Sequence, residues 1–212
     1  MSEPTAVVRG RRTSRPRGDE RERGILDTAE RLLGEKSYTD ISVDDLARGA
    51  GLSRPTFYFY FPSKEAVLLA LLDRVVAEAR AHRDEAVSSP AGDVETRWRA
   101  VIGAIARTFR SHLAVTLAAA EARATSTAVR EVWNGVMERF VEETAAEIEA
   151  ERSRGTAPEG PPARDLAVAL NWMNERVLHS AFAGEEPGLA ADDVVEVLLT
   201  VWLRTIYGGR VP

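Results

Sequence analysis

The sequence predicts an all-α protein of about nine helices, three short ones followed by six longer ones. Three observations lead to this prediction. Apolar residues recur at helical spacing in almost every segment after residue 18. No stretch alternates apolar and polar residues for long enough to form a strand. The prolines fall mostly at the ends and joints of the helical segments, where they interrupt no helix interior.

The first three helices are expected over residues 19–36, about 43–49 and 54–60. Ser42, with Asp45 three residues later, has the spacing of a capping box, so the second helix should start there. Gly51 ends that helix, and Ser53 should cap the third, with Pro55 tolerated in its first turn.

The remaining helices are longer. Ser63 should cap a fourth helix whose apolar stripe consists of Val67, Leu68, Leu71, Leu72, Val75 and Val76. Further helices are expected over residues 94–111, about 127–154, about 163–183 and 191–207. A shorter helix follows residue 111 and runs to about residue 124. A linker rich in proline and glycine, residues 155–162, separates two of them.

Composition excludes several classes of protein. The 212 residues include no cysteine, so a disulfide framework, a thiolate metal site and a cysteine nucleophile are excluded. Three scattered histidines give no ligand cluster, and no metal or cofactor is expected. The longest apolar run, residues 66–72, is too short for the roughly 20 residues of a membrane span. No secretory signal is recognisable, so a cytoplasmic protein without a membrane partner is the default.

Charge is distributed unevenly along the chain. The net charge is −5, yet residues 1–18 contain five arginines and one glutamate. A basic arm on an acidic body suits an anionic partner that is touched at one end only. The arm is expected to be flexible, and it either follows DNA phosphates or serves only as a solubilising tail.

Residues 42–60 are the most informative stretch. Two short helices joined by the tight turn at residues 50–53 predict a helix-turn-helix, whose second helix fits the major groove of DNA. Arg54 could reach a guanine edge, and Lys64 a phosphate at a helix amino terminus. The alternative is a helical hairpin within a bundle. The residues expected at the DNA are Ser42, Ser53, Arg54, Pro55, Thr56, Tyr58, Tyr60 and Lys64.

Residues 51–67, which read GLSRPTFYFYFPSKEAV, and the preceding ISVDDLA resemble the signature of the tetracycline-repressor family of transcription regulators. This resemblance implies a three-helix DNA-binding head, residues 19–64, and a six-helix body for ligand binding and dimerisation, residues 65–212. It also implies operator DNA as a partner and a repressor that a ligand releases.

Aromatic residues recur along the helices of the body, and two amides lie on a half-apolar face. Taken alone, these residues leave open a filled core with paired asparagines. The resemblance implies instead a pocket for a small hydrophobic ligand with a hydrogen-bonding group. The residues expected to line it are Trp98, Ile102, Ile105, Phe109, Trp133, Met137, Phe140, Asn171, Asn174, Glu175, Leu178 and Trp202.

The last two helices should form the interface of a homodimer, through an apolar face of Val194, Val197, Leu198 and Val201. The alternative for this face is packing within the chain.

No motif for a positioned nucleophile, a phosphate loop or a dinucleotide site is recognisable, so the chain is not expected to be an enzyme. Two functions remain. One is a ligand-responsive repressor, and the other is a dimeric DNA-binding protein with a filled core and no effector.

Overall fold

The computed structural model describes residues 17–88 and 93–208. Within these ranges the chain forms nine α-helices, one short 3-10 helix and no strand, which confirms the all-α prediction. Residues 1–16 of the predicted arm lie outside the described residues. No helix in the described ranges is long and apolar enough to cross a membrane.

The elements are α1 (Arg17–Leu33), η1 (Tyr38–Asp40), α2 (Val43–Gly49), α3 (Arg54–Tyr60), α4 (Lys64–Ser88), α5 (Val94–Ser111), α6 (Leu113–Ala122), α7 (Thr127–Ser153), α8 (Ala163–Ala183) and α9 (Val194–Tyr207).

Side-chain caps set the start of several helices, as the sequence predicts. The Ser42 hydroxyl accepts a hydrogen bond from the Asp45 N–H, and the Asp45 carboxylate accepts one from the Ser42 N–H, both at 3.1 Å. Ser53 and Asp93 cap α3 and α5 by accepting from backbone N–H groups. Gly51 has a φ of 67°, a left-handed conformation that allows the tight turn between α2 and α3.

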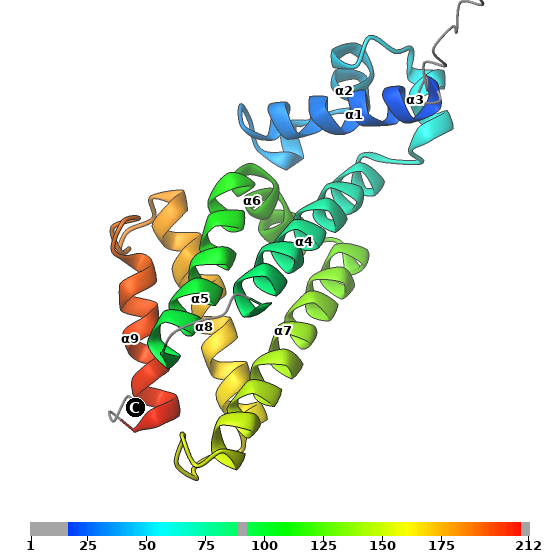
Figure 1. Cartoon of the computed structure of the whole chain (residues 1–212). Coiled ribbons are helices and arrows are strands. Elements are labelled where there is room, and N and C mark those ends of the chain that lie inside the picture. Colours follow the sequence, from blue (N-terminus) through cyan, green and yellow to red (C-terminus); the bar gives the residue numbers. More distant parts are fainter. Residues whose placement is uncertain (1–16, 89–92, 209–212) are drawn as a thin grey trace, which may run out of the picture.

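The first three helices form a head at one end of the molecule, and α4 leads from it into a bundle of α5 to α9 (Figure 1). One hydrophobic cluster joins buried residues of α1 to α4 with residues of α6 and α7. A second cluster lies mainly among α5, α8 and α9. The first cluster continues across the predicted boundary between head and body at residues 64 and 65. The position of that boundary therefore stays a prediction.

Helix α6 is hydrogen-bonded to the head. The Glu121 carboxylate, near the end of α6, accepts hydrogen bonds from the backbone N–H groups of Tyr38 at 3.1 Å and Thr39 at 3.2 Å. These N–H groups belong to the first residues of η1 and have no partner within that short helix. The body thus holds the head by a polar contact as well as by the shared apolar cluster.

His112 forms a second polar contact between the body and the head. It lies between α5 and α6, with Nδ1 2.8 Å from the Glu30 carboxylate of α1 and Nε2 3.0 Å from the Glu78 carboxylate of α4. Burial lowers the pKa of His112, but hydrogen bonds to the two carboxylates and their charges outweigh burial, so this pKa is raised above its ordinary value. Helices α1 and α4 therefore meet the junction of α5 and α6 at one imidazole.

We predict that His112→Gln destabilises the protein more at about pH 6 than at about pH 8.5. Because the pKa of His112 is raised in the folded state, its stabilising contribution is complete below about pH 6.5 and is lost as the pH rises through the folded-state pKa. For this partly exposed group the loss near pH 6 should be on the order of 1 kcal/mol. Urea unfolding at both pH values, at one protein concentration, measures it. An equal loss at both pH values would contradict the ionic contact.

Candidate functional site

Helix α3 presents an exposed face and a buried face. Phe57, at 0% exposed, and Phe61, which follows the helix, are buried in the first hydrophobic cluster. The exposed side carries Arg54, Tyr58 and Phe59. The buried aromatics fix the rotation of the helix, so the remaining side chains are directed outward.

Arg54 is held in place by two neighbours on this surface. Its Nη1 donates to the Asp44 carboxylate of α2 at 2.9 Å, and its Nη2 donates to the Tyr58 hydroxyl at 3.3 Å. A guanidinium has five N–H donors, so donors remain for a further acceptor. Two hydrogen bonds thus orient the guanidinium at the amino end of α3. In a helix that reads a groove, this end carries the contacts to bases.

The other residues predicted to contact DNA differ in their exposure and in whether their polar groups are already hydrogen-bonded within the head. The hydroxyls of Ser53 and Thr56 lie 2.8 Å apart, and the Ser42 hydroxyl donates to Asp45 at 2.8 Å, so all three already have partners within the head. Pro55 is exposed in the first turn of α3. Tyr60 is half-buried and packs against the first hydrophobic cluster.

Phe59 has the most exposed large apolar side chain on this face, at 82%, and the sequence interpretation gave it no role. It lies four residues after the exposed Pro55, so the two share one face of the helix. The four-residue spacing from Pro55, a predicted DNA contact, was the sequence signal that could have placed Phe59 on the same surface. An exposed phenyl group on a groove-reading helix can contact a thymine methyl group.

Lys64 has a different placement from the phosphate contact that the sequence suggested. Its ammonium group donates to the backbone carbonyls of Tyr38 at 2.9 Å, Thr39 at 3.2 Å and Ile41 at 2.8 Å. An ammonium has three N–H donors, and these three carbonyls engage all of them. The reason for the difference is that η1 ends beside the start of α4, so the carbonyls of this turn lie within reach of the ammonium group.

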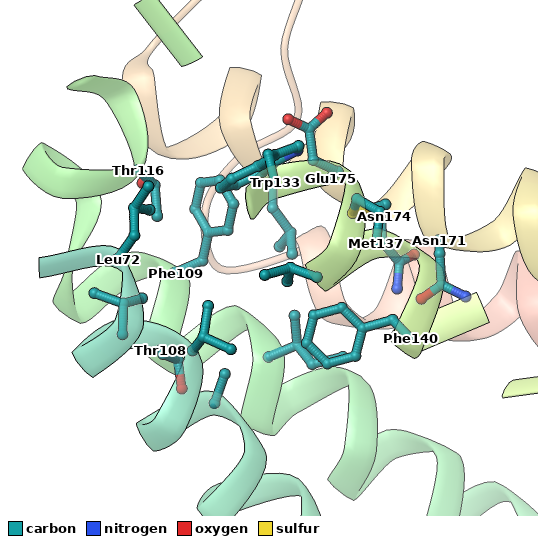
Figure 2. Close-up of a pocket in the computed structure, with 16 residues that line it drawn as sticks. Leu72, Thr108, Phe109, Thr116, Trp133, Met137, Phe140, Asn171, Asn174 and Glu175 are labelled. Carbon is teal, nitrogen blue, oxygen red and sulfur yellow. The ribbon is translucent and has the colours of Figure 1, made fainter. Parts of the chain in front are cut away.

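The body contains an apolar cavity with about 700 Å³ of empty space, part of it open to solvent. Figure 2 shows Trp133, Met137 and Phe140 of α7 around this space with Phe109 of α5. Nine of the twelve predicted residues line it: Ile105, Phe109, Trp133, Met137, Phe140, Asn171, Asn174, Glu175 and Leu178. The sequence interpretation missed seven others: Leu72, Val75, Val76 and Ala79 of α4, with Thr108, Thr116 and Val136.

Two hydrogen-bond donors in the cavity wall have no partner among the described residues. These are Nδ2 of Asn174, a residue 3% exposed, and Nε1 of Trp133, a residue 8% exposed. Asn171 differs, because its amide donates to the Thr144 hydroxyl at 3.1 Å and the Ala167 carbonyl at 2.8 Å. A buried donor without a partner costs about 1–3 kcal/mol, so an acceptor placed here would be bound favourably.

Trp98, Ile102 and Trp202 do not line this cavity, contrary to the sequence prediction. They are buried in the second hydrophobic cluster, where the rings of Trp98 and Trp202 lie 5.1 Å apart. The indole of Trp98 donates to the Tyr207 hydroxyl at 3.0 Å, and that of Trp202 donates to Asn174 Oδ1 at 2.9 Å. Both tryptophans therefore fix α5 and α8 to α9, behind the cavity wall.

The apolar face predicted for α9 is divided in the structure. Val194 and Leu198 are buried within the chain, at 0% and 1% exposed, because they pack in the second hydrophobic cluster. Val197 and Val201 are exposed, at 40% and 38%. On α8, Trp172 is also exposed, at 41%.

The fold and these sites define a class of protein: a helix-turn-helix head joined by one long helix to a helical body with an apolar cavity. Residues 25–71 match the family model described as "Bacterial regulatory proteins, tetR family". Residues 98–208 match "Transcriptional regulator EthR, C-terminal domain". The chain belongs to the TetR family of DNA-binding transcriptional regulators, with a C-terminal domain of the EthR type.

Two relatives, matched over almost their whole length, support this assignment, and a solved structure of lower identity shares the fold. The chain is 55% identical over 204 residues to the HTH-type transcriptional regulator EthR of Mycobacterium tuberculosis H37Rv. This match covers 96% of this chain and 94% of the relative. It is 51% identical, with the same coverage, to EthR of Mycolicibacterium smegmatis. A putative regulator of Saccharomonospora viridis, solved with choline, has a TM-score of 0.74 and 24% identity over 89% of this chain and 98% of that chain. Membership of a family of regulators confirms the prediction that the chain is not an enzyme.

We predict that Lys64→Met lowers the free energy of unfolding by about 2 kcal/mol, because three carbonyls lose a charged donor. The control is Arg31→Met, which removes an exposed ion pair with Glu35 and should cost about 0.5 kcal/mol or less. Urea denaturation of both variants tests this difference. If Lys64→Met were no more harmful than the control, the ammonium would not be anchoring α4.

Proposed function

We propose that the protein is a homodimeric repressor that leaves its operator when an apolar ligand carrying a hydrogen-bond acceptor fills the cavity. The observation that carries this proposal is the position of α4. Only three residues separate the end of α3 from the start of this helix, and Leu72, Val75, Val76 and Ala79 of the same helix line the cavity. A ligand therefore touches the helix that supports the DNA-reading element.

The proposed DNA contact places α3 in the major groove. Arg54 is the candidate for a guanine edge, because it is exposed and keeps unused donors. Phe59 adds an apolar contact, and the phenol of Tyr58 reaches a phosphate or a base. Ser42, Ser53, Thr56 and Lys64 are then residues that position the head, since their polar groups are already bonded within it.

The proposed dimer uses the exposed apolar residues of α8 and α9. Val168, Trp172, Val197 and Val201 remain between 36% and 41% exposed in the single chain. Four apolar side chains on two adjoining helices suit a four-helix interface with a second copy. Such a dimer would set two heads at major grooves about 34–36 Å apart, or a multiple of that distance.

The cavity favours a particular class of ligand. Hydrocarbon side chains form most of its wall, which suits a mostly apolar molecule. The unpartnered donors on Asn174 and Trp133 suit a carbonyl or ether oxygen. The alternative of a filled core without an effector has less support, because an apolar cavity, part of it open to solvent, lies between α4, α5, α7 and α8.

In this proposal, the protein leaves its operator because the ligand binds two conformers of the protein with different affinities. The cavity includes Thr116 of α6 as well as four residues of α4, and both helices contact the head. A ligand that fits better when these helices have moved shifts the heads away from the groove spacing. Each tenfold difference in affinity for the two conformers shifts their equilibrium by about 1.4 kcal/mol.

We predict that Arg54→Ala weakens binding to the DNA upstream of the protein's own gene by about 1–3 kcal/mol and leaves binding to scrambled DNA nearly unchanged. The selective loss is expected because the guanidinium reads a base. The control is Arg164→Ala, which removes an exposed arginine of α8 that pairs with Glu138 in the body. Fluorescence anisotropy at one salt concentration measures both duplexes. Equal losses on specific and scrambled DNA would contradict base reading by Arg54.

For the ligand, we predict that 1-phenyl-1-hexanone binds about tenfold more tightly than hexylbenzene, because only the ketone offers an acceptor to the buried donors. Asn174→Leu and Trp133→Phe should each reduce this preference. Asn171→Leu is the matched control, since the Asn171 amide is already bonded within the protein and the preference should persist. Titration calorimetry gives the affinities. A ketone preference that survives in both Asn174→Leu and Trp133→Phe would overturn the role of these donors.

A further inference from the structure

A second cavity lies beside the first, between α4, α5 and α7. It has about 690 Å³ of empty space, part of it open to solvent. Arg83, Val101 and Thr144 line it. Each of these residues is four positions along its helix from a residue of the first cavity, namely Ala79, Ile105 and Phe140. Four residues advance a helix by about 6 Å, so the two cavities follow one another along the same three helices, with the second farther from the head.

The wall of the second cavity is rich in guanidinium groups, whose formal charge Glu147 in the wall and Glu143 and Glu151 behind it balance. The three guanidinium groups that line it come from α4, from α5 and from the residue that follows α7: Arg83, Arg97 and Arg154. Glu147 is the one carboxylate among its lining residues in the described part of the chain. The first cavity has a nearly all-apolar wall, so polarity changes sharply where one cavity follows the other.

Two carboxylates outside the lining orient these arginines. Glu143 lies 2.8 Å from Arg83, whose side chain is only 13% exposed. Glu151, at 1% exposed, accepts from both Arg97 and Arg154 through a single oxygen. Each guanidinium uses one nitrogen in these contacts, and it has five N–H donors in all. Pre-oriented donors therefore remain for an anion inside the cavity.

We infer that the second cavity binds the carboxylate of an amphiphilic ligand whose hydrocarbon chain occupies the apolar cavity. Arginine recognises carboxylates through paired, charge-assisted hydrogen bonds, and three such groups surround this space. Trp98 and Val101 supply an apolar part of the wall, against which the last methylene groups of the chain can pack. This inference rests on the proposed function and adds to it the chemical class of the ligand.

The test compares octanoate, decanoate and dodecanoate with their uncharged methyl esters, by titration calorimetry on the full chain. The carboxylates should bind at least about tenfold more tightly than the matching esters. The double variant Arg83→Gln/Arg154→Gln should lose this preference while ester affinity changes little. Glu147→Gln should act in the opposite direction and strengthen carboxylate binding several-fold, because it removes a like charge from the wall.

Two further variants keep the result interpretable. Arg164→Gln removes an arginine outside both cavities and should leave the preference unchanged. Arg83→Lys/Arg154→Lys keeps the charge and should retain part of the preference if the double glutamine variant folds poorly. Esters that bind as tightly as carboxylates would overturn this inference and leave the proposed function standing. Failure of both ligand series to bind would overturn the inference and also count against the cavity as a ligand site.

Discussion

The hydrogen bonds from Lys64 to three backbone carbonyls fix where α4 leaves the head, and the rest of the molecule depends on that direction. Helix α4 is 25 residues long, which corresponds to about 37 Å at 1.5 Å per residue. Its first turns pack under α1 and α2, and its middle turns line the cavity. Because a continuous helix bends little, a displacement at Val75 or Ala79 is carried to the head rather than absorbed between them.

Buried polar groups divide the body into a fixed part and an open part. On α9, Trp202 uses its indole N–H on Asn174, and on α5, Trp98 uses its own on Tyr207, so the wall of α5, α8 and α9 is closed by internal hydrogen bonds. The Asn174 amide then has a fixed orientation, with its oxygen occupied and its N–H₂ group unpartnered at the cavity. The same contact that joins α9 to α8 thus leaves a buried donor without a partner beside the cavity among the described residues. Rigid donors bind an acceptor without a further cost of ordering.

Local signals in the sequence were enough to predict most of the fold. The capping box of Ser42 and Asp45 and the caps at Ser53 and Asp93 depend on residues close in sequence, and these helix starts were predicted correctly. Long-range contacts were not predictable from spacing. Lys64 meets carbonyls 23 to 26 residues away, and the pairing of Trp98 with Trp202 joins α5 to α9. Helical periodicity identifies an apolar face, but it does not say whether that face meets a cavity, the core or a second copy.

The contacts that join the body to the head set how a ligand can act on DNA binding. Glu121 of α6 holds η1, and His112 holds Glu30 of α1 and Glu78 of α4, so α4 and α6 each contact both the cavity and the head. Charge-assisted hydrogen bonds of this kind contribute a few kcal/mol at most, which is the size of a typical coupling free energy between two sites. In the proposed mechanism, a ligand that separates α4 from α6 strains these contacts, and operator DNA favours the conformer that keeps them. By linkage, DNA then weakens ligand binding by the same factor as the ligand weakens DNA binding.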